Sequence, residues 1–291
     1  MKLLTYVHEG QEKVGVIGTD PEKVVSIAAL GYQSKDMVGF IREIGGEIPA
    51  DLLARVDAAA GERLADCKLL APIPCPEQDV MCLGTNYQEH RDETAKSTVV
   101  YDASKTDTIY FGKRVNRAVD PDGFIEGHFD IVERLDYEVE LAVIIGKDAK
   151  DVPIEKAEDY VLGYTILNDV SARNLQTIHQ QWYFGKSLDG FTPIGPWIVT
   201  KDEIAWLPEL GIRSYINGEL RQNSNTNMMI TNVDAVICEL TQGMTLRAGT
   251  IIAMGTPSGV GMAFDPPKCM KAGDVCRCEI DGIGVLENTV R

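Results

Sequence analysis

Three acidic residues occur at the spacing that a divalent metal site needs. Glu138 and Glu140 lie two residues apart beside the apolar run 141–145, so in a strand their side chains point to the same face. Asp169 follows a second apolar run, at 161–167. Neighbouring carboxylates repel one another, and burial strengthens the repulsion. A hard cation with oxygen ligands, Mg²⁺, Mn²⁺ or Ca²⁺ rather than Zn²⁺, would relieve it, which indicates metal-assisted chemistry on a small oxygen-rich substrate.

Each of these acidic residues also has a plainer interpretation. A Glu-Val-Glu sequence is common on the solvent face of a strand, and Asp169 is well placed to cap the helix expected after it. The continuous apolar run 141–145 instead indicates a strand buried on both faces, with Glu138 and Glu140 at the mouth of a pocket. Capping and metal binding are compatible roles for Asp169 if one carboxylate oxygen faces the metal.

A possible proton-transfer pair follows the apolar strand at 80–83. Gly84 allows a turn there, and the helix expected next places His90 and Glu93 three residues apart on one face. A carboxylate beside an imidazole orients the ring and raises its basicity, which is how a water molecule is activated. The plainer alternative is an exposed ion pair on a helix.

Further polar residues have the chemistry to hold a carboxylate. Arg173 and Gln176 share a helix face directly after Asp169, and Lys186 follows them. Thr256 lies in the glycine-rich segment 254–261, which lacks the Gly-Lys-Ser/Thr ending of a phosphate loop but offers a hydroxyl and backbone N–H groups. The alternatives are ordinary surface side chains for the first three and a simple turn for the last.

Composition narrows the class of protein. The 291 residues carry a formal net charge of −16, and the pI is near 4.7, which opposes binding to nucleic acid or to anionic membranes. The chain start becomes polar too early for a signal peptide, and no apolar run approaches the roughly 20 residues of a membrane helix. The seven scattered cysteines, including Cys276 and Cys278, indicate reduced, structural thiols. We expect a soluble cytoplasmic protein.

The predicted elements indicate two unequal domains and a mainly β fold with short helices, of the α+β class. A small α/β domain is expected over residues 1–75, and the proline-rich run 71–76 marks its boundary with a larger domain over 76–291. The polar segment 92–124 is typical of a lid or binding loop. Strands are predicted at 2–7, 14–17, 24–27, 80–83, 138–145, 161–167, 197–200, 212–216, 250–254 and 274–280, with hairpin turns at 217–218 and 281–282. Helices are predicted at 36–44, 50–60, 154–158, 172–180 and 233–242.

Taken together, these segments resemble the fumarylacetoacetate hydrolase family over about residues 78–290. Any one segment is weakly specific, but five in the same order are strongly so. The matching pieces are Gly84-Thr-Asn-Tyr with His90-x-x-Glu93, Asp136-Tyr-Glu-Val-Glu140, Asn168-Asp-Val-Ser-Ala-Arg173, Lys186-Ser-x-Asp189 and Gly255-Thr-Pro-Ser-Gly-Val-Gly261.

The resemblance implies a mixed β-roll, a homodimer and bound Mg²⁺ or Mn²⁺. It makes Glu138, Glu140 and Asp169 the metal ligands. It makes His90 and Glu93 the water-activating dyad, on a short helix that orders when substrate binds. The residues implied to hold the 2-oxo-acid end of the substrate are Arg173, Gln176, Lys186 and Thr256.

Two positions depart from the family pattern. Thr85 stands where relatives that decarboxylate oxaloacetate carry an arginine, which makes that activity less expected here. In the run 111–116, Lys113 keeps the place of a family lysine, and Arg114 adds a charge. These two cations are expected to favour a substrate with a second carboxylate.

The expected function is divalent-metal-dependent hydrolysis of an acylpyruvate or related 2,4-dioxo acid at its C3–C4 bond, with release of pyruvate. Lys186 would help orient the substrate while Glu93 and His90 deprotonate water. Two alternatives stay open. One is isomerisation or decarboxylation of an unsaturated 2-oxo dicarboxylate, and the other is a catalytically silent, metal-binding oligomeric protein.

Overall fold

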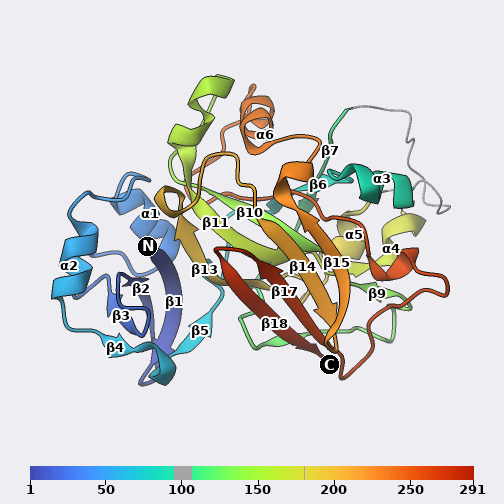
Figure 1. Ribbon diagram of the computed structural model, residues 1–291, viewed down its shortest axis with the longest axis horizontal. Coiled ribbons are helices and arrows are strands. Elements are labelled where there is room, and N and C mark those ends of the chain that lie inside the picture. The colour runs from blue at the N-terminus through green and yellow to red at the C-terminus, as the bar shows by residue number, and fades with distance from the viewer. Residues whose placement is uncertain (95–106, 180) are drawn as a thin grey trace.

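The computed structural model describes residues 1–94, 107–179 and 181–291, and it is dominated by two sheets (Figure 1). The large sheet has the strand order β4-β3-β2-β1-β13-β11-β10-β16-β6-β7, with β5 also paired to β1. The second sheet has the order β15-β14-β17-β18-β8. Short helices surround them, so the predicted α+β class is confirmed. Part of the predicted lid segment 92–124 lies outside the described residues.

The N-terminal strands extend the large sheet. β1 (Lys2–His8) pairs with β13 (Ile194–Thr200), with Lys2 opposite Val199, so one sheet runs across the predicted domain boundary. In Figure 1 the N-terminal helices lie at the opposite end of the molecule from α3, α4 and α5. The division at residue 75 stays a prediction. The other N-terminal elements are β2 (Gln11–Ile17), β3 (Lys23–Ser26), α1 (Met37–Glu43), α2 (Leu52–Ala58), β4 (Glu62–Arg63) and β5 (Lys68–Leu70).

Two fully buried strands form the centre of the large sheet. Every residue of β10 (Val139–Ile145) and β11 (Val161–Asn168) is buried, as the continuous apolar runs predicted. They pair antiparallel, with Val139 opposite Asn168, so the start of one strand meets the end of the other. The strands beyond β10 are β16 (Ile251–Ala253), β6 (Val80–Gly84) and β7 (Ile109–Lys113).

The second sheet shows the alternation typical of a half-buried antiparallel sheet. β14 (Gly211–Ile216) alternates strictly between buried and partly exposed positions. The predicted turns at 217–218 and 281–282 join β14 to β15 and β17 to β18, which confirms both hairpins. Cys276 and Cys278 are buried free thiols on β17. The remaining strands of this sheet are β15 (Glu219–Asn225), β17 (Val275–Ile280), β18 (Gly284–Val290) and β8 (Phe124–Ile125).

The helices around the sheets are short. The helix predicted at 154–158 is a 3₁₀ helix, Ile154–Tyr160, in which Lys156 N donates to Pro153 O at 2.9 Å. The helix predicted at 172–180 is α4 (Arg173–Ile178), and residue 180 lies outside the described residues. Among the described residues, no helix is both long and apolar enough to cross a membrane. The other elements are α3 (Gln88–Thr94), α5 (Tyr183–Lys186), α6 (Val233–Leu240), the paired strands β9 (Leu135–Asp136) and β12 (Ser171–Ala172), and 3₁₀ turns Leu64–Asp66, Lys201–Glu203, Thr226–Met228 and Gly261–Ala263.

Candidate active site

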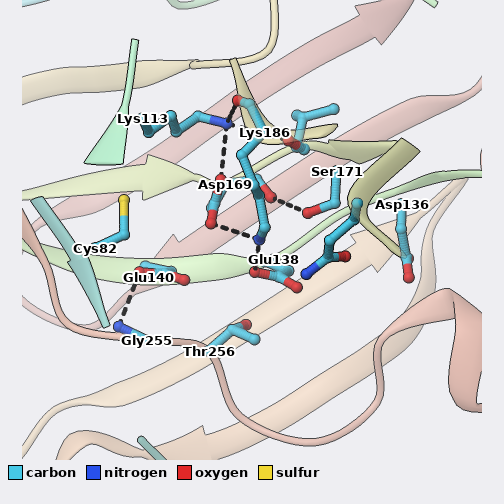
Figure 2. A network of polar contacts seen from close by, with 12 residues as sticks. Cys82, Lys113, Asp136, Glu138, Glu140, Asp169, Ser171, Lys186, Gly255 and Thr256 are labelled. Atoms are coloured by element: carbon cyan, nitrogen blue, oxygen red, sulfur yellow. Dashed lines mark hydrogen bonds and ion pairs between the residues drawn. The ribbon is translucent and has the colours of Figure 1, made fainter. Parts of the chain in front are cut away.

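The three predicted metal ligands meet at the centre of the large sheet (Figure 2). Glu138 and Glu140 flank the first residue of β10, and Asp169 follows the last residue of β11. The pairing of β10 with β11 brings them together, and Asp169 N donates a hydrogen bond to Glu138 O at 2.8 Å. Their carboxylate oxygens lie within 4.8 Å of one another, and the three side chains are buried.

The carboxylates of this triad have unequal pKa values. Burial and the nearby charges of Asp169 and Glu138 raise the pKa of Glu140 well above its ordinary value, although Gly255 N donates to its Oε2 at 2.8 Å. Burial also opposes ionisation of Glu138, but the positive charges of Lys186 and Arg173 outweigh it and lower that pKa to about 2. Burial first, and the two neighbouring carboxylates second, therefore oppose a negative charge on Glu140 and raise its pKa.

The triad therefore fits a hard divalent cation. Its donors are all carboxylate oxygens, which suit Mg²⁺ or Mn²⁺ and do not distinguish between them. A cation held by Glu138, Glu140 and Asp169 would remove the repulsion that raises the pKa of Glu140.

Two lysines approach Asp169 from different sides (Figure 2). Lys186 Nζ lies 2.7 Å from Glu138 Oε2 and 2.6 Å from Asp169 Oδ2. Burial opposes the charge on Lys186, but Asp169 and Glu138 outweigh it and raise its pKa to about 12. Lys113 Nζ lies 2.7 Å from Asp169 Oδ1 and donates to the backbone oxygens of Val170 and Lys186.

Arg173 is held in place by carboxylates. Its Nε donates to Asp136 Oδ2 at 2.9 Å, and its Nη1 lies 2.7 Å from Glu138 Oε1 and donates to Gln176 Oε1 at 3.1 Å. Asp136 also accepts hydrogen bonds from the backbone N–H groups of Gly261 and Met262, at 2.7 and 3.0 Å. Asp136 thus ties Arg173 to the glycine-rich segment. Asp136 lies in the same sequence motif as Glu138, but its spacing alone does not indicate this contact with Arg173.

The predicted dyad forms on α3. His90 Nδ1 lies 3.0 Å from Glu93 Oε2, and the imidazole is buried. Glu93 also accepts a hydrogen bond from Gly259 N at 3.0 Å. A hydrogen bond donated by Nδ1–H to Glu93 would leave Nε2 as the proton acceptor of the neutral ring. The dyad is thereby fixed to the segment that carries Thr256.

Thr256 uses its hydroxyl within the protein. Its Oγ1 donates to Val139 O at 2.9 Å and accepts from Gln222 Nε2 at 2.7 Å. The side chain is buried and borders the cavity beside Glu140. The hydroxyl of Thr256 donates its proton to the first residue of β10, so in the predicted contact with substrate it would act as an acceptor.

One cavity brings most of the predicted residues together. Seven of them line it: His90, Glu138, Glu140, Arg173, Gln176, Lys186 and Thr256. Asp169 and Glu93 lie behind these residues, each in contact with a residue that does line the cavity. Thr85 also lines the cavity, with a φ of 50°.

The two cations expected to favour a second carboxylate do not line this cavity. Lys113 is fully buried behind Asp169, and Arg114 is exposed, 3.8 Å from Asp79; neither lines the cavity. The cavity is instead bordered by Arg134, which sequence reasoning missed because no local pattern distinguishes it. Aromatic walls were also missed: Phe111 and Trp182 pack with ring centroids 5.2 Å apart.

Known proteins are similar in sequence to the part of this chain that carries the cavity residues. The family model for the fumarylacetoacetate (FAA) hydrolase C-terminal domain matches residues 79–291. The oxaloacetate tautomerase YisK of Bacillus subtilis is 41% identical over 227 residues, which cover 78% of this chain and 74% of that protein.

Solved structures match the whole chain. A fumarylacetoacetate hydrolase from the psychrophile Exiguobacterium antarcticum is 39% identical, with a TM-score of 0.86 over 100% of this chain and 99% of that one. A maleylpyruvate hydrolase from Sphingobium sp. SYK-6, solved with manganese(II) and pyruvate, is 28% identical, with a TM-score of 0.78 over 100% of this chain and 98% of that one.

Proposed function

Because the chain belongs to the fumarylacetoacetate hydrolase family, we propose that it is a divalent-metal-dependent enzyme that interconverts the keto and enol forms of a 2-oxo acid. The observation that carries the proposal is the shared cavity, whose lining brings His90 together with two carboxylates of the triad, Glu138 and Glu140. The cations Arg173 and Lys186 line the same cavity. The similarity to a protein named as an oxaloacetate tautomerase supports this choice of reaction.

The reaction needs a proton acceptor near C3 and a positive environment near the 2-oxo group. His90 is oriented by Glu93, 3.0 Å away, and would accept the C3 proton as the C2–C3 double bond forms. Arg173 and Lys186 would hold the substrate carboxylate at the cavity wall. A cation held by the triad would act as a Lewis acid that stabilises negative charge on the enolate. His90 would then give the proton to the C2 oxygen, which yields the enol, and the reverse transfer from that oxygen to C3 yields the keto form.

Hydrolysis of an acylpyruvate at its C3–C4 bond is the second candidate. The same dyad that accepts a C3 proton would instead deprotonate a water molecule, which attacks the C4 carbonyl. The observation that favours it is the oriented His90–Glu93 pair, together with the similarity to a maleylpyruvate hydrolase. Both candidates pass through an enolate and share the substrate's 2-oxo-acid end.

Two assays separate the candidates. The decay of oxaloacetate enol absorbance, followed with Mg²⁺, Mn²⁺ or EDTA, should accelerate only with metal if the enzyme is a tautomerase. Pyruvate release from acetylpyruvate and fumarylpyruvate under the same conditions reports hydrolysis. Metal-dependent pyruvate release without faster enol decay would place hydrolysis first, and no change in either assay would reject both.

A further inference from the structure

Three cationic side chains line the active-site cavity, and they differ in their partners. Arg173 contacts Asp136 and Glu138, and Lys186 contacts Glu138 and Asp169. Within the described parts of the chain, the side chain of Arg134 makes no ion pair or hydrogen bond, and the residue is exposed. Of the three cations, Arg134 is therefore the one whose charge is not paired with Asp136, Glu138 or Asp169.

The backbone of Arg134 has a defined place beside Arg173. Arg134 directly precedes β9, whose residue Leu135 is buried opposite Ala172 of β12. Arg173 N donates to Arg134 O at 2.9 Å, so the two arginines lie on neighbouring paired segments. Arg173 is buried against the triad, whereas Arg134 lies on the exposed side of the cavity.

We infer that Arg134 is a specificity-determining residue that binds an anionic group at the end of the substrate remote from the 2-oxo acid. The inference rests on the proposed function for the orientation of the substrate. A guanidinium presents two parallel N–H donors that match a carboxylate. In a chain of net charge −16, a dianion needs a local cation at each end. Arg173 and Lys186 are the cations at the 2-oxo-acid end, and Arg134 is the cation that the cavity offers to the other end.

The test uses two probes that differ only in the charge of the remote group, oxaloacetate and its 4-methyl ester. Binding to the Mn²⁺-loaded protein is followed by rapid-mixing tryptophan fluorescence, because Trp182 lines the cavity. The variants are Arg134→Gln, Arg134→Lys and the matched control Arg114→Gln, which removes the same charge from an exposed site outside the cavity.

We expect Arg134→Gln to weaken oxaloacetate binding about 10-fold and to change ester binding less than about 2-fold. Arg134→Lys should restore part of the affinity, and Arg114→Gln should match wild type. Equal loss for both probes, no loss for either, or the same loss in Arg114→Gln would overturn the inference. So would failure of the wild-type protein to bind either probe with metal present.

The binding assay and the turnover assays fail independently. If wild type shows neither enol decay nor pyruvate release but binds oxaloacetate in an Arg134-dependent way, the proposed reaction is wrong and the dicarboxylate site stands. If wild type turns over 2-oxo acids but binds the ester as tightly as oxaloacetate, the proposed reaction stands and the role inferred for Arg134 is wrong.

Discussion

Lys113 Nζ lies 2.7 Å from Asp169 Oδ1, and neither side chain is exposed to solvent. This contact makes Lys113 a buried counter-ion of Asp169. It also donates to two backbone oxygens, which join the ends of the segments that carry Asp169 and Lys186. Lys113 therefore stabilises the position of Asp169 from the side away from the cavity.

The first prediction is that Lys113→Met destabilises the fold by about 3–5 kcal/mol, because it removes the buried cation that contacts Asp169 Oδ1 and leaves only Lys186, at Oδ2, beside that carboxylate. Urea unfolding measures the loss. The matched control is Lys147→Met, whose exposed pair with Glu47 at 2.9 Å should contribute less than about 1 kcal/mol. A Lys113→Met protein of normal stability with only a raised KM would support a substrate contact instead.

The second prediction concerns Glu140 and metal binding. Burial and neighbouring carboxylates raise its pKa, so protons compete with the cation and metal affinity should rise as pH increases. Glu140→Gln should weaken Mn²⁺ binding at least about 10-fold and flatten this pH dependence. Calorimetric titration with Mn²⁺ at several pH values measures both effects. Glu279→Gln, on the second sheet, should bind as wild type does; unchanged affinity in Glu140→Gln would remove Glu140 from the site.

The third prediction separates the dyad from the metal site. His90→Ala and Glu93→Gln should each lower turnover by about 10²–10⁴-fold, because they remove the oriented proton acceptor. Mn²⁺ affinity should change by less than about 2-fold, since neither residue belongs to the triad. The control is Glu89→Gln, an exposed position on the same helix. Full activity in both dyad variants would show that proton transfer uses another group.

The fourth prediction is a pH-dependent stability in the N-terminal strands. Tyr6 Oη donates to Glu62 Oε2 at 2.5 Å, and Lys13 Nζ lies 2.7 Å from Glu62 Oε1. Burial opposes ionisation of Glu62, but its contacts with Lys13 and Tyr6 outweigh it and lower the pKa below its ordinary 4.5. A lowered folded-state pKa stabilises the fold above pH 4.5, and this stabilisation is lost as the pH falls through the folded-state pKa.

Glu62→Gln should therefore cost about 1 kcal/mol at neutral pH and progressively less in acid. Chemical unfolding of wild type and variant at several pH values between neutral and acid measures the difference. Glu12→Gln, an exposed change on β2, should show no such trend. A constant difference at every pH would mean that ionisation of Glu62 does not contribute.

Local patterns were enough to predict the centre of the site. The two-residue period of a strand places Glu138 and Glu140 on one face, and the apolar run after them requires burial. Helical spacing likewise predicts that His90 can contact Glu93, which the structure places 3.0 Å apart. The two hairpins follow from Asn217-Gly218 and its counterpart at 281–282, because those turns depend on neighbouring residues alone.

Contacts between distant segments decided the rest. Lys113 lies behind Asp169 because β7 pairs with β6 at one edge of the sheet, and no local pattern contains that pairing. Arg134 reaches the cavity because β9 pairs with β12, which brings it beside Arg173. The N-terminal strands join the large sheet through β1 and β13, some 190 residues apart in the chain. Such pairings depend on which surfaces the whole chain must bury together, and that choice is made only when the sheets assemble.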